Sequence, residues 1–166
     1  MFKVFLTKSY KDIAKKTELE DDVIKLVKNR FYTDSYNGAM IENYAYLITM
    51  KASGVPVGYC DLRVGDEVAL KYLGNIGYNI FEHKQGQGLA AHAAQLLVEL
   101  ARKMGLKRIT ITCNTDNIAS VKTIEKLGAV LVDTLNVPAD EPLFHQGDYV
   151  KYIYRVDLIK ENEHEL

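Results

Sequence analysis

The stretch IFEHKQGQGLA, residues 80–90, decides the fold, because it leads from a strand through a glycine-containing loop into a long helix. The segment before it, Gly74 to Phe81, is typical of a strand. From Leu89 to Met104 apolar residues recur at helical spacing, and Gly105 is a natural end. The first N–H groups of a helix have no intrahelical partner and attract anions. The stretch therefore predicts a place where a phosphate can bind.

Two common phosphate-binding motifs do not fit these residues. A GxxxxGK[ST] pattern is lacking, which argues against a P-loop nucleotide hydrolase, and so is a GxGxxG pattern with an acidic residue further on, which argues against a dinucleotide fold. Gly86 and Gly88 would let the backbone approach a ligand closely. A plain turn between a strand and a helix remains the alternative interpretation.

The segments on either side of this stretch predict an α/β fold. We expect a mixed sheet of about six to seven strands with helices on both faces, in a single domain over residues 1–166. Residues 43–51 and 55–64 are rich in β-branched and aromatic residues and form a predicted hairpin through residues 52–54. Further strands are expected at residues 2–6, 107–113, 130–137 and 149–158, and helices within residues 11–30 and at 119–127.

Composition and charge point to small-molecule chemistry in a folded protein. The 166 residues are 48% hydrophobic and 26% charged, with a net charge of −1 and no Lys or Arg run longer than a pair. Nucleic-acid and membrane-surface binders normally carry a basic patch, so we expect neither partner. No stretch approaches the ~20 apolar residues of a membrane span, and the N-terminus does not resemble a signal peptide. A cytoplasmic location is the expectation.

The cysteines do not indicate a metal site or a disulfide framework. Cys60 and Cys113 each lie in an apolar, strand-like run, with no CxxC or Cys/His spacing. We expect two buried thiols and no bound metal.

Two motifs together resemble those of the GNAT superfamily of N-acetyltransferases. Gln85-x-x-Gly88-x-Ala90 resembles the pyrophosphate loop of that family. Downstream, Asn117 is followed three residues later by the small Ser120 and eleven later by Gly128, which resembles the second signature. The resemblance covers about residues 43–136, and it implies a GNAT-like fold in which two neighbouring strands splay apart around the cosubstrate acetyl-CoA.

The resemblance also implies roles for individual residues in transfer of an acetyl group to an amine. The amides of one loop would hold the pyrophosphate: Gln85, Gly86, Gln87, Gly88, Leu89 and Ala90. The backbone of Ile80 would pair with the pantetheine arm, and Asn117 and Ser120 would bind it from the opposite side. The thioester would lie between the strand of Ile80 and that of Ile111, where a backbone N–H can stabilise the developing oxyanion.

One position departs from the family pattern. Many members carry a Tyr seven residues after the Asn to protonate the departing sulfur, but Ile124 stands there. Another group or water would then supply the proton, or the protein is a sensor that binds an acyl-CoA without turning it over. Tyr78, on the same strand face as Ile80, is the candidate acid, with a packing role as the alternative.

Fewer residues in the sequence indicate how the acceptor amine would bind. Period-two alternation places Asp61 and Arg63 on one strand face, where they could orient a charged acceptor or form a solvated salt bridge. The long connection over residues 138–148 is a candidate lid over the acceptor. The acceptor could be a small molecule or a peptide with a free amine. A homodimer is compatible with these features, and the sequence leaves the oligomeric state open.

Overall fold

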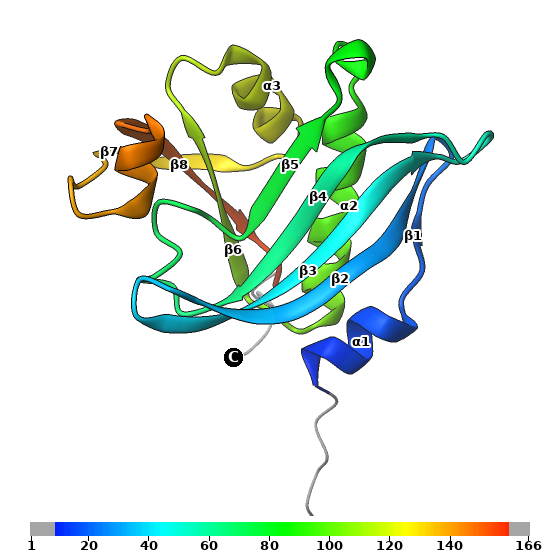
Figure 1. Cartoon of the computed structure of the whole chain (residues 1–166), viewed down its shortest axis with the longest axis horizontal. Helices are drawn as coiled ribbons and strands as arrows, with labels where there is room; N and C mark the ends of the chain where they lie inside the picture. Colours follow the sequence, from blue (N-terminus) through cyan, green and yellow to red (C-terminus); the bar gives the residue numbers. More distant parts are fainter. Residues whose placement is uncertain (1–8, 160–166) are drawn as a thin grey trace, which may run out of the picture.

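The computed structural model describes residues 9–159, which form three α-helices, eight strands and two short 3-10 helices (Figure 1). In chain order the elements are α1 (Tyr10–Lys16), β1 (Leu19–Glu20), β2 (Ile24–Tyr36), β3 (Ala39–Met50), β4 (Pro56–Gly65), β5 (Ile76–Ile80), η1 (Glu82–Lys84), α2 (Leu89–Lys103), β6 (Arg108–Asn114), α3 (Ile118–Lys126), β7 (Val130–Asn136), η2 (Pro142–Gln146) and β8 (Val150–Asp157). The strand expected at residues 2–6 lies outside the described residues.

The strands form two sheets rather than one continuous sheet. Five strands lie in the order β1-β2-β3-β4-β5 and three in the order β6-β8-β7. Within each sheet, all neighbouring strands pair antiparallel. The break falls between β5 and β6, the two strands that the resemblance expected to splay. The expected α/β fold with a splayed strand pair is thus confirmed.

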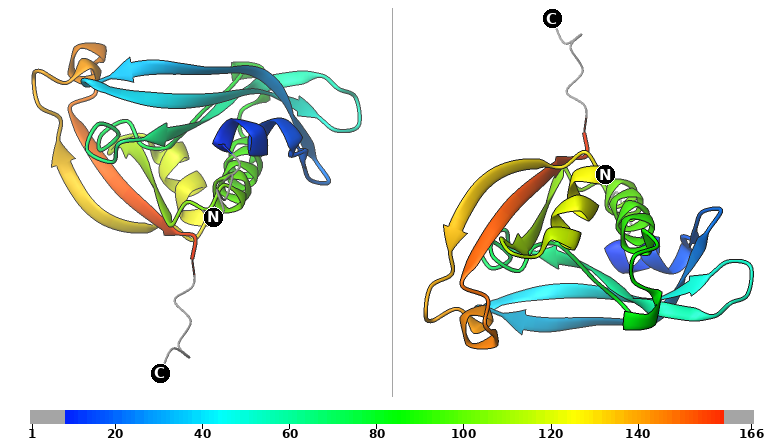
Figure 2. Two further views of the ribbon diagram at one scale, coloured as in Figure 1. Left: turned by 90° about the horizontal axis from the view of Figure 1, so that it is seen from below. Right: turned by 90° about the horizontal axis from the view of Figure 1, so that it is seen from above.

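The helices cover one face of the five-stranded sheet. Figure 2 places α1 and α2 on the same side of it, whereas the sequence order suggested helices on both faces. Leu97 and Leu100 of α2 are fully buried, and they belong to the same core as Tyr46 and Leu62 of the sheet. The residues that alternate with these buried strand residues, among them Arg63, point to the other face. That face is left free to border a site.

The helices expected within residues 11–30 extend only to Lys16, so this part of the prediction is wrong. Ser9 caps α1 by accepting a hydrogen bond from the Asp12 N–H, and the chain then enters the hairpin of β1 and β2. Asp21 Oδ1 accepts hydrogen bonds from the backbone of Val23 and Ile24, which closes that turn. Beyond it, alternate residues face the core, the period of a strand.

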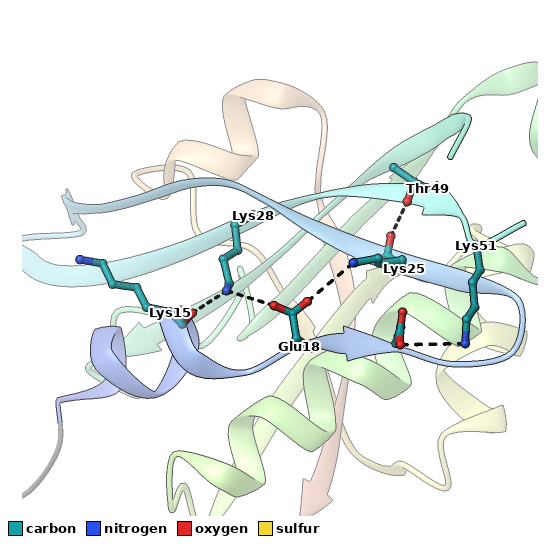
Figure 3. A network of polar contacts seen from close by, with 7 residues as sticks. Lys15, Glu18, Lys25, Lys28, Thr49 and Lys51 are labelled. Carbon is teal, nitrogen blue, oxygen red and sulfur yellow. Dashed lines mark hydrogen bonds and ion pairs between the residues drawn. The ribbon is translucent and has the colours of Figure 1, made fainter. Parts of the chain in front are cut away.

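Charged side chains join α1 and the segment before β1 to strand β2 of the large sheet (Figure 3). Lys28 Nζ donates to the Lys15 carbonyl at 2.5 Å and lies 3.9 Å from Glu18, which also lies 3.8 Å from Lys25. Surface ion pairs of this kind each contribute roughly 0–1 kcal/mol. The burial of Ala14 and Leu19 in the core therefore does more to hold this edge.

No helix within residues 9–159 combines the length and the apolar character that crossing a bilayer requires.

Candidate active site

The site is built around the gap between β5 and β6. The two strands are joined at one end, where the Asn75 N–H donates to the Thr110 carbonyl at 2.7 Å and the Thr110 N–H donates to Asn75 Oδ1 at 2.8 Å. Beyond this point they belong to different sheets and do not pair. The bonds at Asn75 therefore act as the vertex from which the strands diverge (Figure 1).

The edge of β5 that faces the gap carries backbone N–H and C=O groups with which a ligand could pair. The Phe81 N–H donates to the Val57 carbonyl of β4 at 2.9 Å. Because alternate residues of an antiparallel strand direct their backbone groups to opposite edges, Tyr78 and Ile80 direct theirs to the gap. The Gln85 side chain folds back, and its Nε2 donates to the Ile80 carbonyl at 3.0 Å. The Ile80 N–H is thus directed into the gap, beside a carbonyl that Gln85 holds in place.

The loop that leads into α2 leaves an open surface at the helix N-terminus. Gly86 and Gly88 have φ values of +84° and +74°, which L side chains rarely adopt, and a Cβ added at either would meet no atom within 4 Å. Gly88 is the N-cap residue of α2. Leu89 is buried and Ala90 packs against the core, so these two could offer a ligand only their backbone. The geometry suits an anion held by amides.

Residues from opposite walls of the gap meet at its centre. Asn117 caps α3, its Oδ1 accepting from the Ser120 N–H at 3.1 Å. The Ser120 hydroxyl lies 2.6 Å from the Tyr78 hydroxyl, which joins α3 to β5. Burial raises the pKa of Tyr78, so its phenol stays protonated at neutral pH. Ile124, one turn further along α3, is fully buried and packs in the core.

A cavity of about 260 Å³ opens beside this pair of hydroxyls. Its walls combine apolar side chains with polar ones, and five of the latter are ionisable: Arg63, Tyr78, Cys113, Asp148 and Lys151. Both cysteines are free and buried, as expected, and Cys113 faces this cavity. Within residues 9–159 no group of three His, Cys, Asp or Glu side chains is arranged to hold a metal ion.

Asp61 and Arg63 form an ion pair within one strand. Arg63 Nε lies 2.9 Å from Asp61 Oδ2, and Arg63 Nη1 donates to the carbonyls of Leu73 and Gly74. A Cβ on Gly77 would come within 2.5 Å of both side chains, so the pair needs glycine there. Burial raises the pKa of the Asp61 carboxyl, and the Arg63 charge opposes this shift. Arg63 also lines the cavity, but most of its N–H groups already donate to Asp61, Leu73 and Gly74.

Asn114, Asp148 and Lys151 were missed by the sequence analysis. Asp148 Oδ1 accepts from Asn114 Nδ2 at 2.6 Å, and Asp148 Oδ2 lies 3.6 Å from Lys151 Nζ. Lys151 is only 8% exposed. The available signal was a lysine near the start of the mainly apolar strand VKYIYRV, but only the pairing of β6 with β8 places Asn114 opposite it.

The connection over residues 138–148 closes one side of the cavity. Leu143 of η2 and Asp148 line it. Glu141 is 5% exposed and accepts hydrogen bonds from the Tyr36 hydroxyl and from Asn37 Nδ2, at the tip of the hairpin formed by β2 and β3. Burial raises the pKa of the Tyr36 hydroxyl, and its hydrogen bond to Glu141 raises this pKa further. Glu141 therefore fastens this connection to the large sheet.

Replacing Glu141 by alanine should lower stability by about 1–3 kcal/mol, because the buried carboxylate and its two hydrogen bonds, to Tyr36 and Asn37, are lost. For a chain of this size each kcal/mol corresponds to a fall in Tm of about 2–4 °C. Thermal unfolding of Glu141→Ala measures the effect, with Asp140→Ala as the control, since Asp140 is exposed. Equal Tm values for the two variants would contradict the role assigned to Glu141.

Comparison with known proteins agrees with this geometry. The model of the acetyltransferase (GNAT) domain matches residues 8–130. The uncharacterized N-acetyltransferase YnaD of Bacillus subtilis is 36% identical over 73 residues, 41% of this chain and 43% of that protein. The chain thus matches less than half the length of that relative.

Two solved structures show the same fold. One is the microcin C7 self-immunity acetyltransferase MccE in complex with acetyl-CoA and AMP, with a TM-score of 0.54 and 25% identity over 69% of this chain and 61% of that one. The other is RimL, the ribosomal L7/L12 alpha-N-protein acetyltransferase, with a TM-score of 0.55 and 21% identity over 72% of each chain. Because the family model spans most of the chain and includes both the loop before α2 and the start of α3, the chain belongs to the GNAT acetyltransferase family.

Proposed function

We propose that this protein binds acetyl-CoA and transfers its acetyl group to an amine. The observation that carries the proposal is the gap between β5 and β6, which combines a free strand edge with an open helix N-terminus at one end. A strand edge suits an extended amide-containing arm, and a helix N-terminus suits a pyrophosphate. Family membership and the acetyl-CoA complex of MccE support this choice of cosubstrate.

The residues around the gap fit such a ligand. The amides from Gln85 to Ala90, including those of Gly86, Gln87, Gly88 and Leu89, would hold the pyrophosphate, where a Cβ at either glycine would reach only open space. The Ile80 backbone would pair with the arm. Asn117 uses Oδ1 as a helix cap, so its Nδ2 is the part available to a ligand, with Ser120 beside it. Acetyl-CoA supplies an activated acyl group, and the protein orients it.

The hydroxyl pair of Tyr78 and Ser120 is the proposed proton source for the leaving sulfur. Each hydroxyl can donate to the other at 2.6 Å, which leaves one hydrogen free for a neighbouring atom. Because burial keeps the phenol protonated, the pair can give a proton at neutral pH. Ser120 would then act in proton delivery as well as in binding.

A second candidate function is acyl-CoA binding without turnover. Ile124 favours it, because this position is fully buried in the core and offers no acid where many family members have a Tyr. The Tyr78 and Ser120 pair counts against it. Incubation with acetyl-CoA and a panel of primary amines, comprising n-butylamine, spermidine, L-lysine and an alanine dipeptide amide, decides between the two through release of free thiol.

We expect acetyl-CoA at a hundred times its Kd to raise the free energy of unfolding by about 2.7 kcal/mol, since it binds only the folded state. At this chain length that is a rise in Tm of about 5–10 °C. ATP and NAD, which have no pantetheine arm, serve as controls. An equal shift with ATP or NAD would contradict the assignment of acetyl-CoA.

A further inference from the structure

The cavity beside Tyr78 and Ser120 holds one carboxylate among its described lining residues, Asp148. An amine must lose a proton before it can attack an acyl carbon, and ordinary alkyl amines are protonated at neutral pH. Burial raises the pKa values of Tyr78 and Cys113, so both are protonated and serve as proton donors only. Arg63 and Lys151 are cations. Asp148 is the remaining lining group that can accept a proton.

Asp148 is held rigidly. Its side chain is 20% exposed, and both its oxygens have partners: Asn114 Nδ2 at 2.6 Å and Lys151 Nζ at 3.6 Å. The Lys151 contact is longer than a hydrogen bond, so that oxygen retains room for another donor. Each carboxylate oxygen can accept more than one hydrogen bond. The carboxylate is therefore oriented and still able to accept from a ligand.

Asn114 orients the Asp148 carboxylate at the wall of the cavity. A carboxylate accepts only from donors, so Asn114 must turn Nδ2 toward Asp148 and Oδ1 away from it. That Oδ1 is buried and has no hydrogen-bond partner among the described residues. The hydrogen bond to Asp148 therefore fixes which way the Asn114 amide faces.

We propose that Asp148 binds the ammonium group of the acceptor and takes its proton, while Asn114 Nδ2 holds the carboxylate in place. This inference rests on the proposed acetyl transfer and defines its acceptor as a primary amine that arrives protonated. One N–H bond breaks, its electron pair stays on nitrogen as the nucleophile, and the proton forms an O–H bond on Asp148. The carboxylate returns when that proton passes to solvent.

Charged and titratable groups surround Asp148 on several elements. Lys151 lies on β8, Cys113 on β6 and Arg63 on β4, and all three line the cavity with it. Tyr36 of β2 is close enough to respond to the charges of Asp148, Arg63 and Glu141. Each of these groups is present in both the parent and an Asp148 variant. The ratio of the rates of the two proteins therefore reports the effect of the Asp148 carboxylate.

The test compares Asp148→Asn with the parent and with Asp133→Asn, whose carboxylate lies on the exposed strand β7. The acceptor is the best amine of the panel above. At pH 7 we expect kcat/KM of Asp148→Asn to fall about a hundredfold, as for loss of a general base. Near pH 10 the neutral fraction of an alkyl amine in solution is several hundredfold larger than at pH 7, so the deficit should shrink to less than about fivefold. Affinity for acetyl-CoA and the activity of Asp133→Asn should stay unchanged.

A second readout does not depend on turnover. Calorimetric titration of the same amine into protein saturated with coenzyme A should show binding weakened at least about tenfold in Asp148→Asn at pH 7. If the variant proves unstable, Asp148→Ala with added formate replaces it, and formate should restore part of the rate. A deficit that is equal at all pH values, or full activity at pH 7, overturns the role of Asp148 while leaving acetyl transfer intact. A parent that transfers to no amine overturns both proposals.

Discussion

Replacing Gly88 by valine is expected to raise the Kd for acetyl-CoA at least about a hundredfold, or ~2.7 kcal/mol. The residue has φ of +74°, a conformation costly for a β-branched side chain, and its missing Cβ faces the open surface where the pyrophosphate is proposed to lie. The valine would both strain the loop and occupy the space of the ligand. Titration of acetyl-CoA by calorimetry measures the loss.

Gly54→Val is the matched control for backbone strain. Gly54 has φ of +72° and equally open surroundings, but it lies in the turn between β3 and β4, away from the gap. Both variants should lose stability to a similar degree, and only Gly88→Val should lose acetyl-CoA. If Gly88→Val binds acetyl-CoA as tightly as the parent, the loop does not hold the pyrophosphate.

Ser120→Ala should lower kcat by about 10- to 100-fold. General acid catalysis contributes typically 10²–10⁴-fold, and a thiolate is a fair leaving group, which places the effect at or below the lower end. Tyr78→Phe removes the other hydroxyl of the same contact and almost no volume. If the two hydroxyls deliver one proton together, the double variant should lose little more than either single variant.

Tyr59→Phe is the control for Tyr78→Phe, because Tyr59 is an exposed tyrosine on the neighbouring strand β4. It should keep the parental kcat. Additive losses in the double variant would mean that Tyr78 and Ser120 act separately. An unchanged kcat in both single variants would move proton delivery to water.

The segment from Asn43 to Leu127 was predictable to within a few residues because its signals are local. The hairpin of β3 and β4, the loop before α2, and the caps of α2 and α3 depend on turn chemistry and on spacing within about ten residues. The same motifs led to the family, which the model of the GNAT domain confirms.

The N-terminal part was harder to predict, because its apolar residues fit the period of a helix as well as that of a strand. Ile13, Val23, Ile24 and Val27 can be read at helical spacing, yet β2 runs from Ile24 to Tyr36. Asn37-Gly38, a strong signal for a tight hairpin turn, marks the end of that strand, and both residues have positive φ. Pairing with β3 along its length outweighs the weak helical pattern.

The sequence by itself determined the family, the glycine-containing loop that we propose binds the pyrophosphate, and the position where the usual Tyr is missing, because those features are read from neighbouring residues. Only the tertiary structure decided which side chains share the site. Tyr78 and Ser120 are 42 positions apart, and Asn114 and Asp148 are 34 apart. They meet because β5 and β6 diverge from Asn75 and because β8 pairs with β6. Such contacts depend on how two sheets and a helix pack, which no local pattern encodes.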